Sequence, residues 1–323
     1  MRRHARRLIV GSAGSANSFG TIQSVRDRWS KSVFVIAIDT NPRELVAASV
    51  LADAFVRVPP ARAPEFPNAL RQIAASYPDS SYLPMHDDEI EIAARLARDG
   101  NLPPELDLVA PPSETVRLCG DKWAMHRWLR ANGLPSPETA LATPAALEGM
   151  RGPVILKPRE GCGAKTVQLV RGAADLVTVD PNRWLLQEQL MKPEVGLDVF
   201  LSRDSSRFCC VCREYFMRTS VAMKARVFHD PALAAIAEPL ARGVPIFGAF
   251  LLQVMQDAAS GWQIIDVNPR VGSSVRMSAA VGLDFAAANL ADHWGETTEA
   301  LLRPLAGEHY VVRQYADYVT SRP

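Results

Sequence analysis

Short apolar runs alternate with amphipathic stretches over the first third of the chain. Apolar runs cover residues 8–10, 33–38, 54–58 and 82–83, and a helical pattern spans 68–76. A strand buried on both faces is apolar throughout, so this alternation predicts parallel β-α-β units. We expect residues 1–112 to form a doubly wound α/β domain.

Proline-rich segments at residues 101–104 and 110–113 mark the end of this region. Ser113 is a residue type that caps helices, and a single helix is expected from about Glu114 to Ala131, because an Asn-Gly pair and two prolines follow it. We therefore place a domain boundary between residues 112 and 113.

The remaining two thirds are rich in predicted strands. The first three cover residues 154–157, 166–170 and 184–187, with a glycine-rich loop between the first two. We divide this part into a small lobe, residues 113–187, and a large lobe, residues 188–323.

Composition excludes several classes of protein. The 323 residues carry a formal net charge of +1, with 48% hydrophobic and 22% charged positions, which is typical of a globular protein. The chain lacks the strong basic character of most nucleic-acid-binding proteins, and the arginines at positions 2, 3, 6 and 7 are interpreted as a solvated tail. No apolar run approaches the roughly 20 residues that cross a bilayer. We expect a cytoplasmic protein with small-molecule partners and with neither nucleic-acid nor membrane binding.

The five cysteines are expected to be reduced and structural. Cys209, Cys210 and Cys212 cluster in a strand-like segment without the paired spacing of a zinc site, and the total is odd. Free thiols are the rule in a reducing compartment.

The turn Gly11–Ser15 follows the first strand and opens a helix, and Asp39 closes the second strand. This arrangement is part of a dinucleotide-binding fingerprint, although the full G-x-G-x-x-G is missing. Any tight first crossover of a parallel sheet needs similar glycines. A nicotinamide-dependent oxidoreductase therefore remains a minor alternative.

A candidate phosphate-binding segment spans residues 154–166. Its strand delivers Lys157, and a turn with Gly161 and Gly163 leads to Thr166. Glycines let backbone N–H groups approach an anion and lysine supplies a compensating charge, so the segment suits a polyphosphate. It is not the Walker pattern, because Thr166 leads into a strand. An ordinary hairpin turn is the alternative.

Oxygen-bearing side chains meet in the large lobe. Asp266 and Asn268 project to the same face of one predicted strand, and Gln253 lies on a neighbouring strand. Hard oxygens suit a Mg²⁺ that is bound chiefly through ATP. Arg270 follows at once, and its guanidinium could hold a phosphoryl or carboxylate oxygen. A strand that ends in an Asn-Pro turn is the alternative.

A polar hinge follows the strand at 184–187. It can present backbone donors and acceptors to an adenine edge, and Glu194 could accept from ribose hydroxyls. An ordinary strand end without a ligand explains the same segment equally well. The hinge consists of Gln187, Glu188, Gln189 and Leu190.

The order of these segments resembles the ATP-grasp superfamily, and within it the carbamoyl-phosphate synthetase-like single-unit carboxylate–amine ligases. The resemblance runs from Gly11 to about Leu290, and its most specific motif is Asp-Val-Asn-Pro-Arg at 266–270 followed by Val-Gly-Ser-Ser. It implies a doubly wound pre-ATP-grasp domain followed by two α+β lobes that clasp ATP. It also implies ATP and Mg²⁺ as cofactors, with Mn²⁺ as a substitute. Family members are often dimers, so a homodimer is allowed.

The resemblance assigns roles to single residues. Lys122, which by itself is a typical solvated lysine, and Lys157 would contact the ATP phosphates. The loop from Gly161 to Thr166 would close over them, and Arg270 would lie over the γ-phosphate. These two lysines and Arg270 are the catalytic candidates.

The hinge would hold adenine, with Glu188 at the base and Glu194 at the ribose. The metal positions depart from the usual pattern, because Asp266 replaces the common glutamate and Gln253 replaces a frequent Glu or Asp. Asn268 matches the second metal ligand.

Candidate substrate residues lie outside the nucleotide motifs. The run from His86 to Glu89 follows a predicted strand end, and its Asp87 and Asp88 could hold an ammonium group. An acidic helix N-terminus is the alternative. Candidates for a carboxylate or acyl-phosphate site, with structural or solvated roles as the alternative for the first two, are Arg213, Lys224, Ser273, Ser274 and Arg276.

These features predict an ATP-dependent, ADP-forming carboxylate–amine ligase. It would activate a small carboxylate, for example that of an amino acid, as an acyl phosphate and pass it to an amine. The alternatives are a carboxyphosphate- or thioester-forming ATP-grasp enzyme and a non-catalytic ATP-binding regulatory protein. The length argues against complete two-step carbamoyl phosphate synthesis, which needs paired halves.

Overall fold

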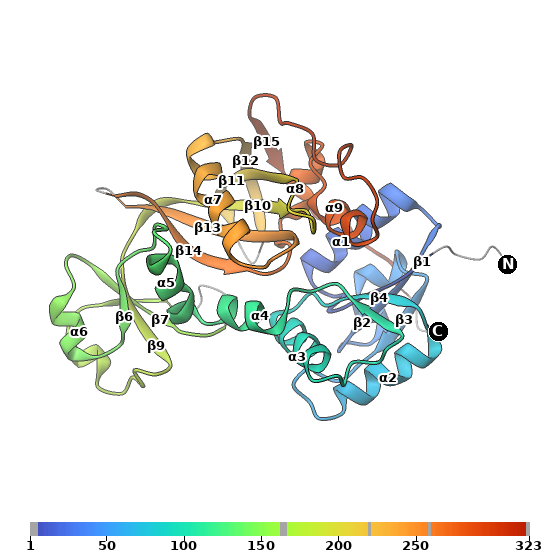
Figure 1. Cartoon of the computed structure of the whole chain (residues 1–323), viewed down its shortest axis with the longest axis horizontal. Coiled ribbons are helices and arrows are strands. Elements are labelled where there is room, and N and C mark those ends of the chain that lie inside the picture. The colour runs from blue at the N-terminus through green and yellow to red at the C-terminus, as the bar shows by residue number, and fades with distance from the viewer. Residues whose placement is uncertain (1–5, 162–166, 219–220, 258–259, 321–323) are drawn as a thin grey trace.

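A computed structural model describes residues 6–161, 167–218, 221–257 and 260–320, and these form three β-sheets. Figure 1 shows a four-stranded sheet at one end, a parallel sheet at the other, and a six-stranded sheet between them.

The N-terminal sheet is parallel, with strand order β3-β2-β1-β4-β5. Helix α1 packs on one face, whereas α2 and α3 pack on the other. This is the predicted doubly wound arrangement. The strands are β1 (Arg6–Val10), β2 (Val33–Asp39), β3 (Ala54–Arg57), β4 (Ser80–Leu83) and β5 (Leu106–Leu108), and the helices are α1 (Ala16–Trp29), α2 (Phe66–Ser76) and α3 (Asp87–Arg98), with 3-10 turns η1 (Arg43–Leu45) and η2 (Ala47–Val50).

The segment after the proline-rich boundary forms two helices, α4 (Ser113–Gly120) and α5 (Lys122–Ala131). The prediction of one continuous helix was wrong. Asp121 breaks it by adopting an extended backbone (φ −103°, ψ 100°), and its carboxylate accepts hydrogen bonds from the N–H groups of Trp123 and Ala124. A short acidic side chain favours such a cap over a helix interior. Ser113 is not the cap of α4 either, because Pro112 occupies that position.

The small sheet is antiparallel, with strand order β6-β9-β7-β8. Helix α6 and the turn η4 cover its apolar side chains. Helix α5, which the sequence-based boundaries place in the small lobe, shares its core with the large sheet through Met125 and Leu129. The elements are β6 (Thr139–Leu141), α6 (Pro144–Gly149), β7 (Val154–Pro158), β8 (Gln168–Val170), η4 (Ala173–Leu176) and β9 (Trp184–Glu188).

The large sheet is antiparallel, with strand order β14-β13-β10-β11-β12-β15. Helix α7 covers one face, and the other face packs toward α8, α9 and the N-terminal domain. Its elements are β10 (Met191–Leu201), β11 (Phe208–Arg218), β12 (Ala222–Phe228), α7 (Pro231–Gly243), β13 (Gly248–Asp257), β14 (Gly261–Asn268), α8 (Val275–Ala280), α9 (Phe285–His293) and β15 (His309–Val312).

The N-terminal domain and the large sheet share one apolar core, which includes Ile22 of α1 and Phe200 of β10. Trp29 packs edge-on against Trp294 across this junction, with ring centroids 5.0 Å apart. Among the described residues, no helix is long and apolar enough to span a membrane, and the cysteines other than Cys162, which lies outside them, are free thiols.

Candidate functional site

One face of the large sheet carries a line of residues in direct cross-strand register. Asp266 pairs with Gln253, Gln253 with Gly196, and Gly196 with Arg213. Their sequence neighbours contribute to the core under α7. Because paired side chains point to the same side of a sheet, the line lies on the face away from α7.

The predicted metal ligands meet on this face. The Asn268 side-chain amide donates to Asp266 Oδ2 at 3.0 Å and to Gln253 Oε1 at 3.4 Å. Gln253 Nε2 in turn donates to Glu194 Oε1 at 2.6 Å. The structure therefore brings the three predicted ligands together and adds Glu194, which the sequence had suggested for the ribose. We call these four side chains the oxygen cluster.

The oxygen cluster suits magnesium on the chemistry of its donors, which are two carboxylates and two amides. In the described part of the chain, no group of three or more His, Cys, Asp or Glu residues could hold a metal. The cluster therefore fits an ion bound largely through nucleotide phosphates, as is common for Mg²⁺, and not an ion held by protein alone.

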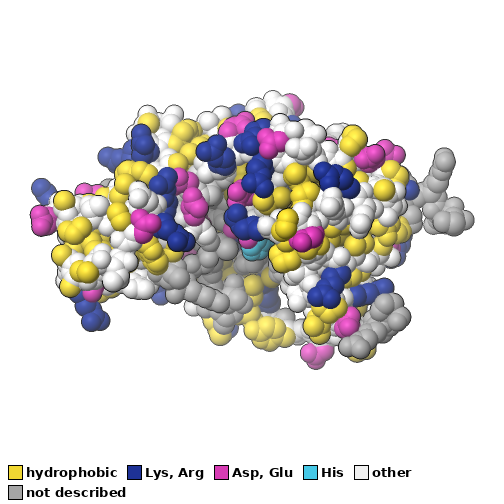
Figure 2. Space-filling model, turned by 90° about the horizontal axis from the view of Figure 1, so that it is seen from below, with side chains coloured by type: hydrophobic (Ala, Val, Ile, Leu, Met, Phe, Trp, Pro, Cys, Tyr) yellow, Lys and Arg dark blue, Asp and Glu magenta, His cyan; other side chains and the backbone are white. Residues whose placement is uncertain are grey.

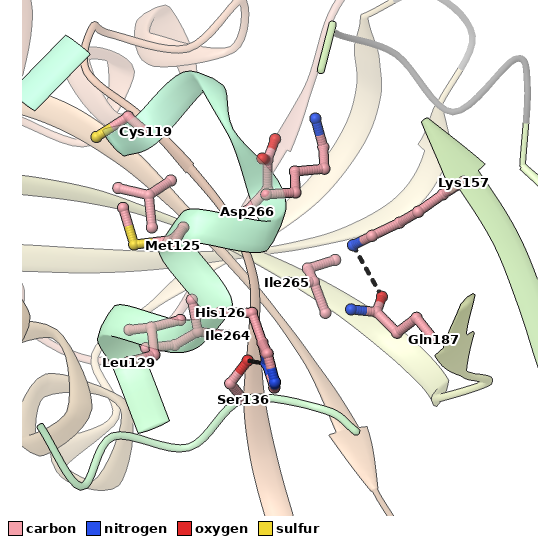
Figure 3. A pocket seen from close by; sticks show the side chains of 12 residues that line it. Cys119, Met125, His126, Leu129, Ser136, Lys157, Gln187, Ile264, Ile265 and Asp266 are labelled. Carbon is pink, nitrogen blue, oxygen red and sulfur yellow. Dashed lines mark hydrogen bonds between the residues drawn. The ribbon is translucent and has the colours of Figure 1, made fainter. Parts of the chain in front are cut away.

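Lys157 of β7 lies near the oxygen cluster and is 92% buried, with 8% of its surface exposed. Its ammonium group donates to Gln187 Oε1 at 2.9 Å, and Gln187 Nε2 donates to Thr139 Oγ1 at 3.0 Å. Burial lowers the pKa of Lys157 to about 8. The negative charge of Asp266 counteracts this shift, and the positive charge of Lys122 adds to it. Figure 3 shows Lys157 pointing toward Gln187 inside a narrow pocket.

Lys122 begins α5 and reaches the candidate phosphate loop. Its ammonium group donates to the carbonyl oxygen of Gly161 at 2.6 Å, and its backbone N–H donates to that of Arg159 at 3.0 Å. The Arg159 guanidinium binds both carboxylate oxygens of Asp121. Gly161 has φ +94°, which favours glycine. The predicted loop residues Gly163 and Thr166 lie outside the described residues.

The predicted adenine hinge lies at the end of β9, which is an inner strand of the small sheet between β6 and β7. Glu188 exchanges hydrogen bonds with the backbone of Glu138, and the N–H of Gln189 donates to the carbonyl oxygen of Pro153. The Gln187 side chain faces Lys157, and Leu190 is half-buried. An open cavity of about 450 Å³ borders Glu188, but it contacts none of the predicted phosphate or metal residues.

Arg270 is joined to the N-terminal domain. Its Nε donates to Asp87 Oδ1, in the first turn of α3, at 2.7 Å. Arg270, predicted to bind the γ-phosphate, and Asp87, predicted to bind an ammonium group, therefore bind each other. Asp88 instead contacts Arg62, and His86 caps α3, so the acidic run is mainly a helix N-terminus and Asp88 is not brought to the site.

Arg213 was predicted to face the substrate, but it is fully buried. It forms an ion pair with Asp198 and donates to Ser278 Oγ at 3.0 Å and to the carbonyl oxygen of Ser274 at 3.4 Å. The guanidinium therefore has a structural role inside the lobe, where it pairs with a buried carboxylate, because a buried charge needs a partner. The carbonyl oxygen of Ser273 accepts from Arg313 at 3.4 Å.

Arg276 and Lys224, which were also predicted to bind the substrate, lie away from the oxygen cluster in the structure. Arg276 binds Asp27 and Ser24 of α1, at 2.9 and 3.1 Å, so it joins the two parts of the molecule. Lys224 is exposed between the buried Met223 and Ala225. Alternation along β12 turns Lys224 away from the face that carries Arg213, because Arg213 pairs with Val227.

Sequence patterns gave no sign of His126. Its Nδ1 lies 2.8 Å from Ser136 Oγ, and it lines the pocket of Lys157 and Gln187. Burial, with the nearby charges of Arg130 and Lys157, lowers the pKa of His126 to about 4, so the imidazole is neutral at pH 7. A single histidine carries no spacing signal, so only the fold could reveal it.

The glycine turn after β1 is occupied by protein. A Cβ on Gly11 would lie 2.1 Å from a carboxylate oxygen of Glu89, which is buried and accepts hydrogen bonds from Ser12 and Tyr82. Burial raises the pKa of Glu89. The turn therefore accommodates an internal carboxyl group where a dinucleotide would place its pyrophosphate, which disfavours the oxidoreductase hypothesis.

Figure 2 shows a recess between the small-sheet end of the molecule and the remainder, with charged side chains of both signs along its borders. A sheet face with clustered oxygens, a buried lysine opposite it and a recess between two lobes are features of a nucleotide-binding enzyme.

Comparison with known proteins agrees with this arrangement. Residues 119–274 match the family model of the ATP-grasp domain. The fold is similar to N5-carboxyaminoimidazole synthetase from Staphylococcus aureus (TM-score 0.72, 14% identity, 91% of this chain and 78% of that chain). It is also similar to biotin carboxylase from Campylobacter jejuni, in a β-γ-ATP complex (TM-score 0.75, 16% identity, 94% and 74%).

A third similar structure is the biotin carboxylase domain of 2-oxoglutarate carboxylase from Hydrogenobacter thermophilus, in complex with MgADP, ADP and bicarbonate (TM-score 0.72, 15% identity, 94% of this chain and 73% of that chain). In sequence, 79 residues are 25% identical to the uncharacterized protein MG011 homolog of Mycoplasma pneumoniae, which is 24% of this chain and 27% of that protein. Residues 119–274 therefore match an ATP-grasp domain, and the fold of the chain is similar to that of structures solved in complex with ADP and with MgADP.

Proposed function

We propose that the protein is an ADP-forming carboxylate–amine ligase. It would activate a small carboxylate, for example that of an amino acid, as an acyl phosphate and transfer the acyl group to an amine. The observation that carries this proposal is the oxygen cluster, whose Asp266 lines the same pocket as the buried Lys157.

The proposed nucleotide site combines two lysines, the start of the glycine loop and the hinge. Lys122 and Lys157 would offset the charge of the ATP phosphates, Gly161 would begin the loop beside them, and the hinge from Gln187 to Leu190 would contact adenine. Glu194 would bind the ribose or, from its place beside Gln253, support the metal. Gly163 and Thr166 would complete the phosphate loop.

Within the oxygen cluster, Gln253, Asp266 and Asn268 would hold the metal. Magnesium supplies charge neutralisation at the phosphate oxygens when it is bound. Manganese would substitute, because the same hard oxygen donors accept it.

The reaction requires little covalent participation by the protein. A carboxylate oxygen of the substrate attacks the γ-phosphorus, and the bond to the β-phosphate oxygen breaks with release of ADP. The amine nitrogen then attacks the acyl carbon, loses a proton, and phosphate departs with the bonding electrons. Lys157 and Arg270 would stabilise charge on the transferred group, so Arg270 must exchange or share its contact with Asp87.

Bicarbonate is a second candidate for the activated group. Two of the similar structures are carboxylase components, and one of them was determined with bicarbonate and MgADP. In that case the intermediate would be carboxyphosphate, formed by the same phosphoryl transfer. A cytoplasmic location and a homodimer remain predictions.

Phosphate release from Mg-ATP tests the proposal. The protein would be assayed with bicarbonate and a panel of carboxylates and amines, singly and in pairs, with mass spectrometry of the products. We expect phosphate release that depends on a pair of substrates, together with a condensed product. Absence of Mg-ATP binding would contradict the nucleotide site, and bicarbonate-dependent release with a carboxylated product would favour the second candidate.

A further inference from the structure

The open cavity beside Glu188 lies where the two lobes meet. Its volume of about 450 Å³ falls within the range of roughly 300–1,000 Å³ that is usual for small-molecule sites. Glu138 and Glu188 belong to the small lobe, whereas Ser260 and Gln263 belong to the hairpin of β13 and β14. Arg130, near the end of α5, borders a third side. A ligand in this cavity would therefore contact both lobes.

The cavity is lined by charges of both signs that the protein does not pair with each other. Among the described residues, neither the Arg130 guanidinium nor the Glu138 carboxylate forms a hydrogen bond or an ion pair. Glu188 Oε1 accepts from the backbone N–H of Glu138 at 3.1 Å. Burial raises the pKa of Glu188, whereas the hydrogen bond from Glu138 and the charge of Arg130 lower it. Arg130 is thus close enough to act on Glu188 without bonding to it.

A buried amide adds a neutral acceptor to the cavity wall. Gln263 is 5% exposed, and its Nε2 donates to the carbonyl oxygen and the hydroxyl of Ser260, at 3.3 and 2.9 Å. Its own side-chain carbonyl accepts from no group in the described part of the chain, so it can accept from a ligand. Leu134 and Pro135 form an apolar wall beside these polar groups.

The lining groups match a free amino acid. Its carboxylate can accept two N–H groups from the guanidinium of Arg130. Its ammonium group has three donors, for which Glu138, Glu188 and Gln263 offer acceptors. An aliphatic side chain would lie against the apolar wall. Ligands of a single charge fit less well, because a phosphate would face two carboxylates and a simple cation would face Arg130.

The cavity is distinct from the proposed phosphate and metal positions. Its lining includes neither of the two lysines and no member of the oxygen cluster. Ser136 lies on the border, because it lines both this cavity and the narrow pocket of Lys157, where its hydroxyl is 2.8 Å from His126 Nδ1. The two spaces are therefore neighbours that have different chemical linings.

We propose that this cavity binds a free α-amino acid with an aliphatic side chain, at a second site beside the nucleotide site. Arg130 holds the carboxylate, and Glu138 holds the ammonium group. Binding here does not depend on the proposed ligase reaction, because none of the phosphate or metal residues takes part in it.

Leucine is the probe, together with two analogues that each lack one charge, 3-methylbutylamine and 4-methylpentanoate. Saturation-transfer NMR on their methyl groups yields dissociation constants with and without Mg-ADP. The site variants are Arg130→Gln and Glu138→Gln. The matched controls are Arg127→Gln on α5 and Glu148→Gln on α6, two exposed residues outside the cavity lining. Glu188 is left unchanged, because it also belongs to the proposed adenine hinge.

We expect the wild type to bind leucine about tenfold more tightly than either analogue. Arg130→Gln should weaken leucine binding by about tenfold without weakening that of the amine. Glu138→Gln should weaken binding of leucine and of the amine, but not that of 4-methylpentanoate. Both control variants should match the wild type, and leucine should bind with or without Mg-ADP.

Leucine that binds no better than its analogues, or equally well to Arg130→Gln and the wild type, would overturn the inference. An equal loss of affinity in the control variants would do the same, as would displacement of leucine by Mg-ADP, which would place leucine in the nucleotide site. A protein that shows the expected leucine pattern but fails to bind Mg-ADP would instead contradict the proposed function and leave this second site in place.

Discussion

At the scale of single residues, Lys157 shows how burial changes the pKa of a side chain. Its ammonium group has a neutral hydrogen-bond partner, Gln187, in place of a carboxylate, and burial lowers its pKa to about 8. A lysine in this state can change charge near physiological pH. Phosphate groups would favour its charged form, so nucleotide binding and protonation should be coupled.

This coupling predicts a pH dependence. Since bound phosphates raise the pKa of Lys157, the complex retains a proton that the free protein loses above about pH 8. Affinity for Mg-ADP should therefore fall between pH 8 and 9.5 by up to about tenfold per pH unit. Calorimetry across this range measures it. Lys157→Met should bind more weakly and with a flat profile, whereas a wild-type slope in that variant would assign the proton to another group.

Asp266 is predicted to be essential for phosphoryl transfer. Asp266→Asn keeps the shape but removes one of the two carboxylates of the oxygen cluster, which should lower phosphate release by about 100-fold and raise the Mg²⁺ concentration required. A magnesium titration of the rate is the measurement. Asp99→Asn, an exposed residue at the end of α3, is the control. Full activity in Asp266→Asn would exclude the metal assignment.

At the scale of elements, the start of α5 links helix capping to the phosphate loop. Asp121 caps α5 and binds Arg159, and the next residue, Lys122, contacts Gly161. The break between α4 and α5 therefore places the lysine at a helix N-terminus beside the loop. One aspartate organises both sides of the proposed phosphate site.

Removal of this cap should affect both stability and binding. Asp121→Ala is expected to lower the free energy of unfolding by about 1–2 kcal/mol and to weaken Mg-nucleotide affinity. The reason is that Arg159 loses its ion-pair partner and the helix end that carries Lys122 loses its cap. Urea denaturation and calorimetry test the two effects. Thr143→Ala removes the cap of α6 and should lower stability alone. Loss of nucleotide affinity in both variants would mean a general effect of destabilisation.

At the scale of the whole molecule, the N-terminal domain and the large sheet form one packed body. Their shared core includes Ile22 and Phe200, and Arg276 bridges to Asp27 across the junction. The small sheet has a separate core of its own. A core shared in this way predicts that the two larger parts lose structure together.

The shared core can be tested through Phe200→Ala. Phe200 is fully buried, so truncation should cost about 3–5 kcal/mol of stability. Although the substitution lies in β10, we expect the N-terminal domain to unfold in the same transition as the large sheet. Hydrogen exchange of β1 and β13 amides in urea follows the two parts separately. Protection of β1 at concentrations that expose β13 would show independent domains.

The amino-acid sequence by itself determined the element types, the parallel N-terminal sheet and the order of motifs that resembles the ATP-grasp superfamily. These follow from local periodicity and from spacing within single segments, as with Asp266 and Asn268 on one strand. It also predicted that Gln253 would meet them, because side chains on one face of adjacent strands are neighbours.

Only the tertiary structure decided how distant charges pair and how side chains of neighbouring strands pack. Arg213 is buried against Asp198, Arg276 turns to α1, and Arg270 meets Asp87 across 183 positions of sequence. Tyr215 is placed by the space above Gly196. Such contacts depend on strand register and lobe packing, which no local pattern encodes, so burial and partner choice emerge only when the chain has folded.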